Sequence, residues 1–65
     1  MDASRSPDGS FIIKLSDIEL GTIGNCLNEV CNGIEVFEFQ TRIGMDLDYV
    51  RDLFAQITEA YRSRR

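Results

Sequence analysis

The sequence of 65 residues contains no histidine and no tryptophan, a single proline and a single lysine. Histidine titrates nearest neutrality and is the commonest metal ligand, so its absence excludes Ser-His-Asp and Cys-His catalysis and the usual zinc hydrolase sites. No glycine-rich phosphate loop joins a strand to a helix. The sequence therefore predicts no catalytic residues, no cofactor and no metal site, and a protein that is not an enzyme.

Cysteines are also few. Cys26 and Cys31 lie five residues apart in a predicted helix, where their Cα atoms would be about 8 Å apart. That separation exceeds the roughly 7 Å limit for a disulfide, so both thiols are expected to be free. No apolar run approaches the length of a membrane span and no signal peptide is recognisable. The expected location is the cytoplasm, with no membrane partner.

Acidic residues outnumber basic ones, at eleven against seven, which gives a net charge of −4. The excess is concentrated in residues 16–60, where nine carboxylates and two arginines leave a charge of −7. Three arginines follow in the last four residues. A hydrophobic content of 43% is typical of a globular domain, and this length limits the chain to one small core.

Residues 1–9 are polar and predict a disordered lead-in that ends in a Pro7–Gly9 turn. Residues 10–62 are expected to form one small domain, with 63–65 as a basic tail. The apolar, β-branched segment 10–15 predicts a strand.

Two helices have clear start signals. Ser16 and Glu19 match a capping box, which predicts a helix over 17–32 that ends at a left-handed Gly33. Asp46 is the expected N-cap of a last helix with an apolar stripe. Two glycines inside the first helix indicate either a close approach by another backbone or simple tolerance. These are Gly21 and Gly24.

The segment 35–43 is compatible with either a strand or a short helix, because periodicity does not decide at this length. With Gly44 as the turn residue, residues 35–54 resemble a helix-turn-helix unit. The apolar positions that carry this resemblance are Phe39, Ile43, Met45, Val50 and Leu53. Gln40 departs from the pattern, which usually has alanine there. The expected fold is mainly α: a small three-helix domain with a helix-turn-helix-like second half, preceded by one short N-terminal β-strand.

The exposed positions of the second helix in that unit carry the wrong charge for DNA. Three carboxylates, Asp46, Asp48 and Asp52, would face the phosphate backbone and repel it. Direct DNA binding is therefore disfavoured. Arg42 is isolated in this acidic region, and a Glu29–Arg42 pair is a candidate structural tie between the first helix and the middle segment.

A second resemblance covers about residues 15–60. The segments LNEVCNGI (27–34) and EFQTRIG (38–44) resemble a pattern in short, uncharacterised bacterial proteins: a helix ending in Asn-Gly, an aromatic Thr-Arg-aliphatic-Gly segment and an amphipathic helix. The resemblance implies a bacterial, self-contained domain and no specific activity.

A lone strand leaves backbone groups unpaired, so strand 10–15 predicts a homodimer formed by pairing with a second copy. The leading functional hypothesis is a non-enzymatic, acidic protein-protein interaction domain. Such a domain would neutralise or regulate the protein that it binds. The alternative is a dimeric helix-turn-helix DNA-binding regulator. The candidate interaction residues are Phe11, Ile13, Lys14, Asp46, Asp48, Tyr49 and Asp52.

Overall fold

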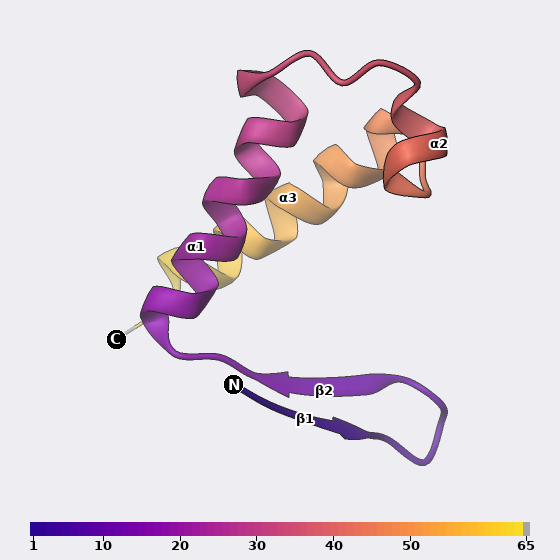
Figure 1. Ribbon diagram of the computed structural model, residues 1–65. Coiled ribbons are helices and arrows are strands. Elements are labelled where there is room, and N and C mark those ends of the chain that lie inside the picture. Colours follow the sequence, from indigo (N-terminus) through magenta and orange to yellow (C-terminus); the bar gives the residue numbers. More distant parts are fainter. Residues whose placement is uncertain (65) are drawn as a thin grey trace.

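The fold is a β-hairpin followed by helices, seen in a computed structural model that describes residues 1–64 (Figure 1). In chain order the elements are β1 (Asp2–Arg5), β2 (Phe11–Lys14), α1 (Asp17–Asn28), the π-helical turn η1 (Glu29–Gly33), α2 (Phe39–Ile43) and α3 (Leu47–Arg62). The expected mainly helical fold with three α-helices is confirmed for this part of the chain. The hairpin replaces the single strand that was expected.

The hairpin closes through a tight turn over residues 6–9. The Ser6 carbonyl accepts from the Gly9 amide at 3.0 Å, and the Ser6 amide donates to the Ser10 carbonyl at 2.8 Å. Gly9 has a φ of 92°, which an L side chain rarely adopts. The Ser10 hydroxyl and the Ser10 amide both donate hydrogen bonds to the Asp8 carboxylate. These hydrogen bonds lower the pKa of Asp8. The Pro7–Gly9 turn predicted from the sequence is therefore present.

Strand β1 occupies the segment that was expected to be a disordered lead-in. It pairs antiparallel with β2, with Ala3 opposite Ile13 and Arg5 opposite Phe11. The expectation of an unpaired strand was therefore wrong, because the chain supplies the partner itself. Residues 2–5 contain no β-branched residue, so their composition gives no strand signal and the turn sets the pairing.

Helix α1 begins at the predicted capping box. The Ser16 hydroxyl accepts from the Glu19 amide at 3.1 Å, and the Glu19 carboxylate accepts from the Ser16 amide at 2.8 Å. The Met1 ammonium lies 3.1 Å from the same carboxylate. Together the Ser16 amide and this ammonium lower the pKa of Glu19.

The helical segment ends at Gly33, as predicted, but by a different mechanism. Its last turn is π-helical, and the Ile34 amide donates to the Glu29 carbonyl at 2.9 Å. Ile34 is extended, and Gly33 does not have the left-handed conformation that was expected. Instead, a Cβ at position 33 would collide with the Glu29 side chain, whose Cδ lies 2.7 Å away.

The ambiguous segment 35–43 is a loop followed by the short helix α2. Glu38 begins this helix with a φ of 52°, and Gly44 ends it with a φ of 98°. A helix, a glycine turn and a second helix are thus present in order. These residues do not form the packing expected of a helix-turn-helix unit, because Ile43 and Met45 remain exposed. The first helix of the unit, α2, is also short, with five residues.

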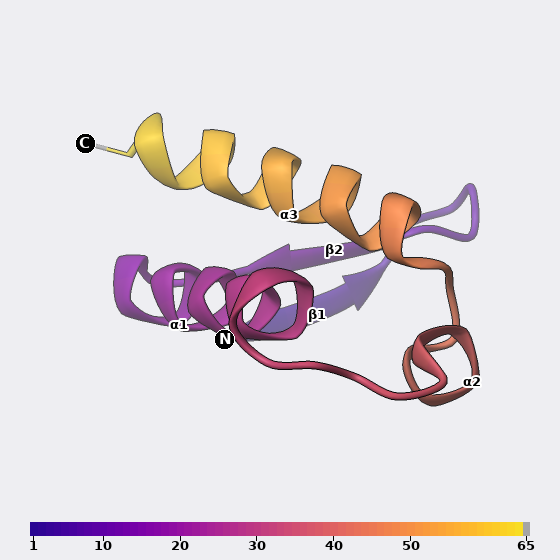
Figure 2. The same cartoon turned by 90° about the horizontal axis from the view of Figure 1, so that it is seen from above.

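Helix α3 begins at Asp46, whose carboxylate accepts from the Tyr49 amide at 2.8 Å, as predicted. It lies beside α1, while the hairpin extends below this pair and α2 lies at the far end from the hairpin (Figures 1 and 2). Among residues 1–64, the side chains that are buried are those of Cys31 and Val50, exposed by 7% and 4%. The chain alone therefore has a very small core.

Candidate functional site

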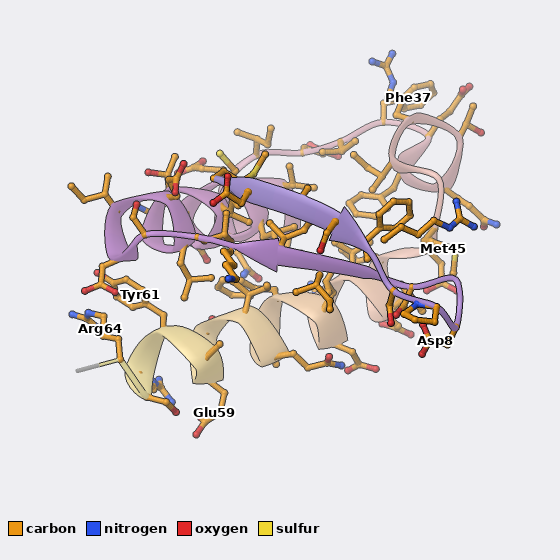
Figure 3. The ribbon with its side chains drawn as sticks, turned by 90° about the horizontal axis from the view of Figure 1, so that it is seen from below. Asp8, Phe37, Met45, Glu59, Tyr61 and Arg64 are labelled. Carbon is orange, nitrogen blue, oxygen red and sulfur yellow. The ribbon has the colours of Figure 1, made fainter. Side chains whose placement is uncertain are left out.

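A groove with a volume of about 390 Å³ lies between α1 and α3. Gly21 and Gly24 line it from α1. An added Cβ would lie 3.1 Å from Tyr61 Cε1 at Gly21 and 3.8 Å from Ile57 Cγ2 at Gly24. The close approach suggested by these glycines is real, but a side chain makes it rather than a backbone. Tyr61 points from α3 toward α1 (Figure 3).

The polar groups of this groove are amides and hydroxyls. Asn25 and Asn28 line it from α1, and Thr58 and Tyr61 line it from α3. None of these side chains carries a charge. Within residues 1–64, no group of three or more cysteine and carboxylate side chains is placed to hold a metal ion. The groove offers hydrogen bonds and apolar contact rather than an acid–base pair.

The outer face of α3 has a different character. Asp48, Asp52 and Glu59 are exposed, and their spacing of four and seven residues places them on one side of the helix. Glu59 points away from α1 and the hairpin (Figure 3). Tyr49 and Leu53 border this row and are 55% and 41% exposed. We call these five residues the acidic face.

A shallow pocket lies within the acidic face. Tyr49, Asp52, Leu53 and Gln56 line it, so apolar and acidic atoms meet at one point of the surface. Among the described residues, no ion pair involves the carboxylates of this face. These carboxylates are thus without an ion-pair partner in residues 1–64, and an exposed aromatic ring beside them is a common feature of protein interfaces.

The predicted interaction residues therefore fall on two separate surfaces. Asp48, Tyr49 and Asp52 belong to the acidic face, and Asp46 caps the same helix. Phe11, Ile13 and Lys14 lie on β2 in the hairpin, and Phe11 is 66% exposed. Sequence reasoning missed Leu53 and Glu59 as members of the acidic face, and Gln56 as part of the pocket beside them. The four- and seven-residue spacing from Tyr49 and Asp52 is the signal that could have found them.

The candidate pair Glu29–Arg42 is not brought together. Among residues 1–64, the ion pair present joins the Met1 ammonium to Glu19, and Arg42 forms none. The side chain of Glu29 instead lies over Gly33 of its own turn. The two residues are separated by the loop between η1 and α2, which carries α2 away from α1 (Figure 1).

The basic tail is partly engaged with the chain itself. The Arg64 guanidinium lies 3.7 Å from the centre of the Tyr61 ring and donates to the Tyr61 carbonyl at 2.9 Å. Arg65 lies outside the described residues. Within those residues, none of the helices combines the length and the apolar composition needed to traverse a bilayer.

Comparisons with known proteins add no relative. No family model, no curated protein and no solved structure matches the chain.

Proposed function

We propose that this chain is a non-enzymatic protein-protein interaction domain that binds a basic protein through the acidic face. The observation that carries the proposal is the position of Tyr49 and Leu53, exposed apolar side chains beside the row Asp48, Asp52 and Glu59. Apolar contact supplies affinity when such side chains are covered, and unpaired carboxylates select a partner of opposite charge.

Charge also favours a fast encounter. Residues 16–60 carry a charge of −7, so the field of the body attracts a basic protein before contact. Such a domain would act as the neutralising or regulatory partner of the protein it covers. DNA is repelled by the same field, and the acidic face lies on the helix that a helix-turn-helix regulator would place against DNA.

The experiment compares two triple variants that lose equal charge. Asp48→Asn, Asp52→Asn and Glu59→Gln neutralise the acidic face, whereas Asp17→Asn, Glu35→Gln and Glu38→Gln neutralise exposed carboxylates elsewhere. Each protein is immobilised, exposed to extract of its host, and the captured proteins are identified by mass spectrometry. We expect the wild type and the second variant to capture the same basic proteins, and the first variant to lose them.

Capture that is equal for the two variants, or that recovers acidic proteins, would overturn the proposal. Two further measurements sharpen the result. Binding of a captured protein should weaken steeply with added salt, and Tyr49→Ala should lower its affinity at least tenfold, as for an interface aromatic. Fluorescence anisotropy with mixed-sequence duplex DNA tests the regulator alternative, and binding at low salt would favour it.

A further inference from the structure

The chain exposes more surface than a folded monomer of its size. Its accessible area is 5421 Å², whereas a compact monomer of 7.4 kDa exposes about 4,200 Å². The excess is about 1,200 Å² per chain. Two copies that covered it against each other would bury about 2,400 Å², which lies in the range of obligate homodimers.

The hairpin contributes to this exposure. Every residue of β1 and β2 is exposed, including Ile12 and Ile13 at 53% each. A two-stranded hairpin is at best marginally stable in water unless further strands or a helix cover it. Here the hairpin extends away from the helix pair rather than packing against it (Figure 1).

The outer edge of β2 is ready to accept another strand. The Ser6 amide donates a hydrogen bond to the Ser10 carbonyl. Hydrogen-bonded and non-hydrogen-bonded pairs alternate along an antiparallel ladder, so Ser4 and Ile12 form the next hydrogen-bonded pair. Phe11 and Ile13 then direct their amides and carbonyls away from β1. Within residues 1–64 no hydrogen bond reaches these outward groups.

We propose that the occupant of this edge is β2 of a second copy, paired antiparallel about a two-fold axis at Ile12. In this register Phe11 of each copy forms a hydrogen-bonded pair with Ile13 of the other, and Ile12 lies opposite its own counterpart. The two hairpins then form one four-stranded sheet. The proposal uses a different surface from the acidic face and does not depend on the proposed function.

Charge on the two edges favours this arrangement. Lys14 is the charged residue of β2, and the register places it opposite Ser10 of the other copy rather than opposite a second lysine. The edge of β1 carries Asp2 and Arg5, and charged side chains on an edge discourage pairing there. The edge of β2 is apolar and complementary to itself, whereas the edge of β1 is charged, so β2 is favoured as the edge that the two copies share.

Two measurements on the unmodified protein test the proposal. Light scattering coupled to size exclusion should give twice the chain mass. Amide hydrogen exchange followed by NMR should show the Phe11 and Ile13 amides protected at least tenfold more than those of Ala3 and Arg5, which occupy the equivalent outward positions of β1. A monomer at millimolar concentration, or a dimer with unprotected Phe11 and Ile13 amides, would overturn the proposal.

A matched pair of variants isolates the edge. Ile13→Pro removes an outward amide of β2, and Ala3→Pro removes the outward amide directly opposite on β1. Both leave the hydrogen bonds within the hairpin in place. Ile13→Pro should raise the dimer dissociation constant at least a hundredfold, and Ala3→Pro should leave it within threefold.

Equal effects of the two prolines would contradict the proposed edge. Because a proline can also disturb the hairpin, a chemically synthesised chain with an N-methylated Ile13 amide gives a second test that keeps the isoleucine side chain. It should be monomeric with an unchanged helical signal. The acidic-face triple variant should remain dimeric, so failure of the dimer and failure of the proposed function are seen separately.

Discussion

Gly21 of α1 lies against the ring of Tyr61 of α3, so close that a Cβ at position 21 would come within 3.1 Å of Tyr61 Cε1 and 3.4 Å of its hydroxyl oxygen. The Arg64 guanidinium covers the same ring at 3.7 Å from its centre. The ring therefore contacts the α1 backbone at a residue without a side chain, and it also holds a cation from just beyond the end of α3. The two glycines of α1 therefore have different neighbours: Gly21 faces the Tyr61 ring and Gly24 faces Ile57.

Gly21→Ala and Gly24→Ala should have opposite effects on stability. Alanine is better than glycine in a helix by about 1 kcal/mol, and a Cβ at Gly24 would meet Ile57 at an ordinary 3.8 Å. Gly24→Ala should therefore raise the midpoint of thermal unfolding. Gly21→Ala should lower it, because the ring must move. In a Tyr61→Ala background the effect of Gly21→Ala should become stabilising, and a penalty that persists there would show that the ring is not its cause.

Ser16→Pro and Ser16→Ala should separate the two halves of the capping box. Ser16 has a φ of −71°, which suits proline, and proline removes the amide that lowers the pKa of Glu19 most. NMR titration of the Glu19 carboxyl should give a higher pKa in Ser16→Pro. Ser16→Ala keeps the amide, so the pKa should stay low while the loss of the cap lowers helix stability by about 1 kcal/mol.

The sign of the pH dependence follows from the same contact. The pKa of Glu19 is lower in the folded chain than its ordinary value of 4.5, so this carboxylate stabilises the fold above that value. Its contribution is lost as the pH falls through the lowered pKa. Circular dichroism should show constant helicity from neutral pH down to about 5 and a decline below 4. Glu19→Gln should flatten this decline, and an unchanged curve would assign it to other carboxylates.

Gly9→Ala should weaken the hairpin without a steric clash. The position has a φ of 92°, and its nearest neighbour for a Cβ is the Arg5 side chain at 4.0 Å. The left-handed conformation costs an L-residue about 1–2 kcal/mol. D-alanine at position 9 in a synthetic chain should restore the hairpin, measured by the Ala3 and Ile13 cross-strand NOEs. If L-alanine and D-alanine at position 9 weakened the hairpin equally, the cause would be the added methyl group and not the left-handed backbone conformation.

Val50→Ala and Leu53→Ala should distinguish the core from the acidic face. Val50 is buried, so truncating it should lower the free energy of unfolding by about 2 kcal/mol. Leu53 is 41% exposed, and its truncation should change unfolding by less than half as much while weakening partner binding. Chemical denaturation and the capture assay together test both residues. A larger stability loss at Leu53 would mean that something covers it in the isolated protein.

The local features of this fold could be predicted because each depends on residues three or four apart. The capping box at Ser16, the cap at Asp46 and the Pro7–Gly9 turn are set by short-range hydrogen bonds. Strand β1 could not be predicted, because its pairing comes from the turn and not from its own composition. The end of α1 was predicted at the right residue for the wrong reason, since the π-helical turn around Gly33 leaves no pattern in the sequence.

The acidic face was predicted only in part. Asp48, Tyr49 and Asp52 were identified from their charge and position, but Leu53 was assigned to packing inside the chain. The periodicity of α3 shows which side of the helix is apolar and not how much of that side another element covers. That depends on where α2 lies, and this short helix, which has positive-φ residues at both ends (Glu38 and Gly44), leaves Leu53 41% exposed.

The small number of buried side chains also bears on how long one copy lasts in a cell. Little apolar surface leaves water when a single copy folds, so a small free energy separates it from opened forms. Proteases cleave the opened forms, at a rate that follows their population. On the proposed dimer and partner, copies that meet neither would be removed first, and the steady amount of the protein would follow the number of its complexes rather than its rate of synthesis.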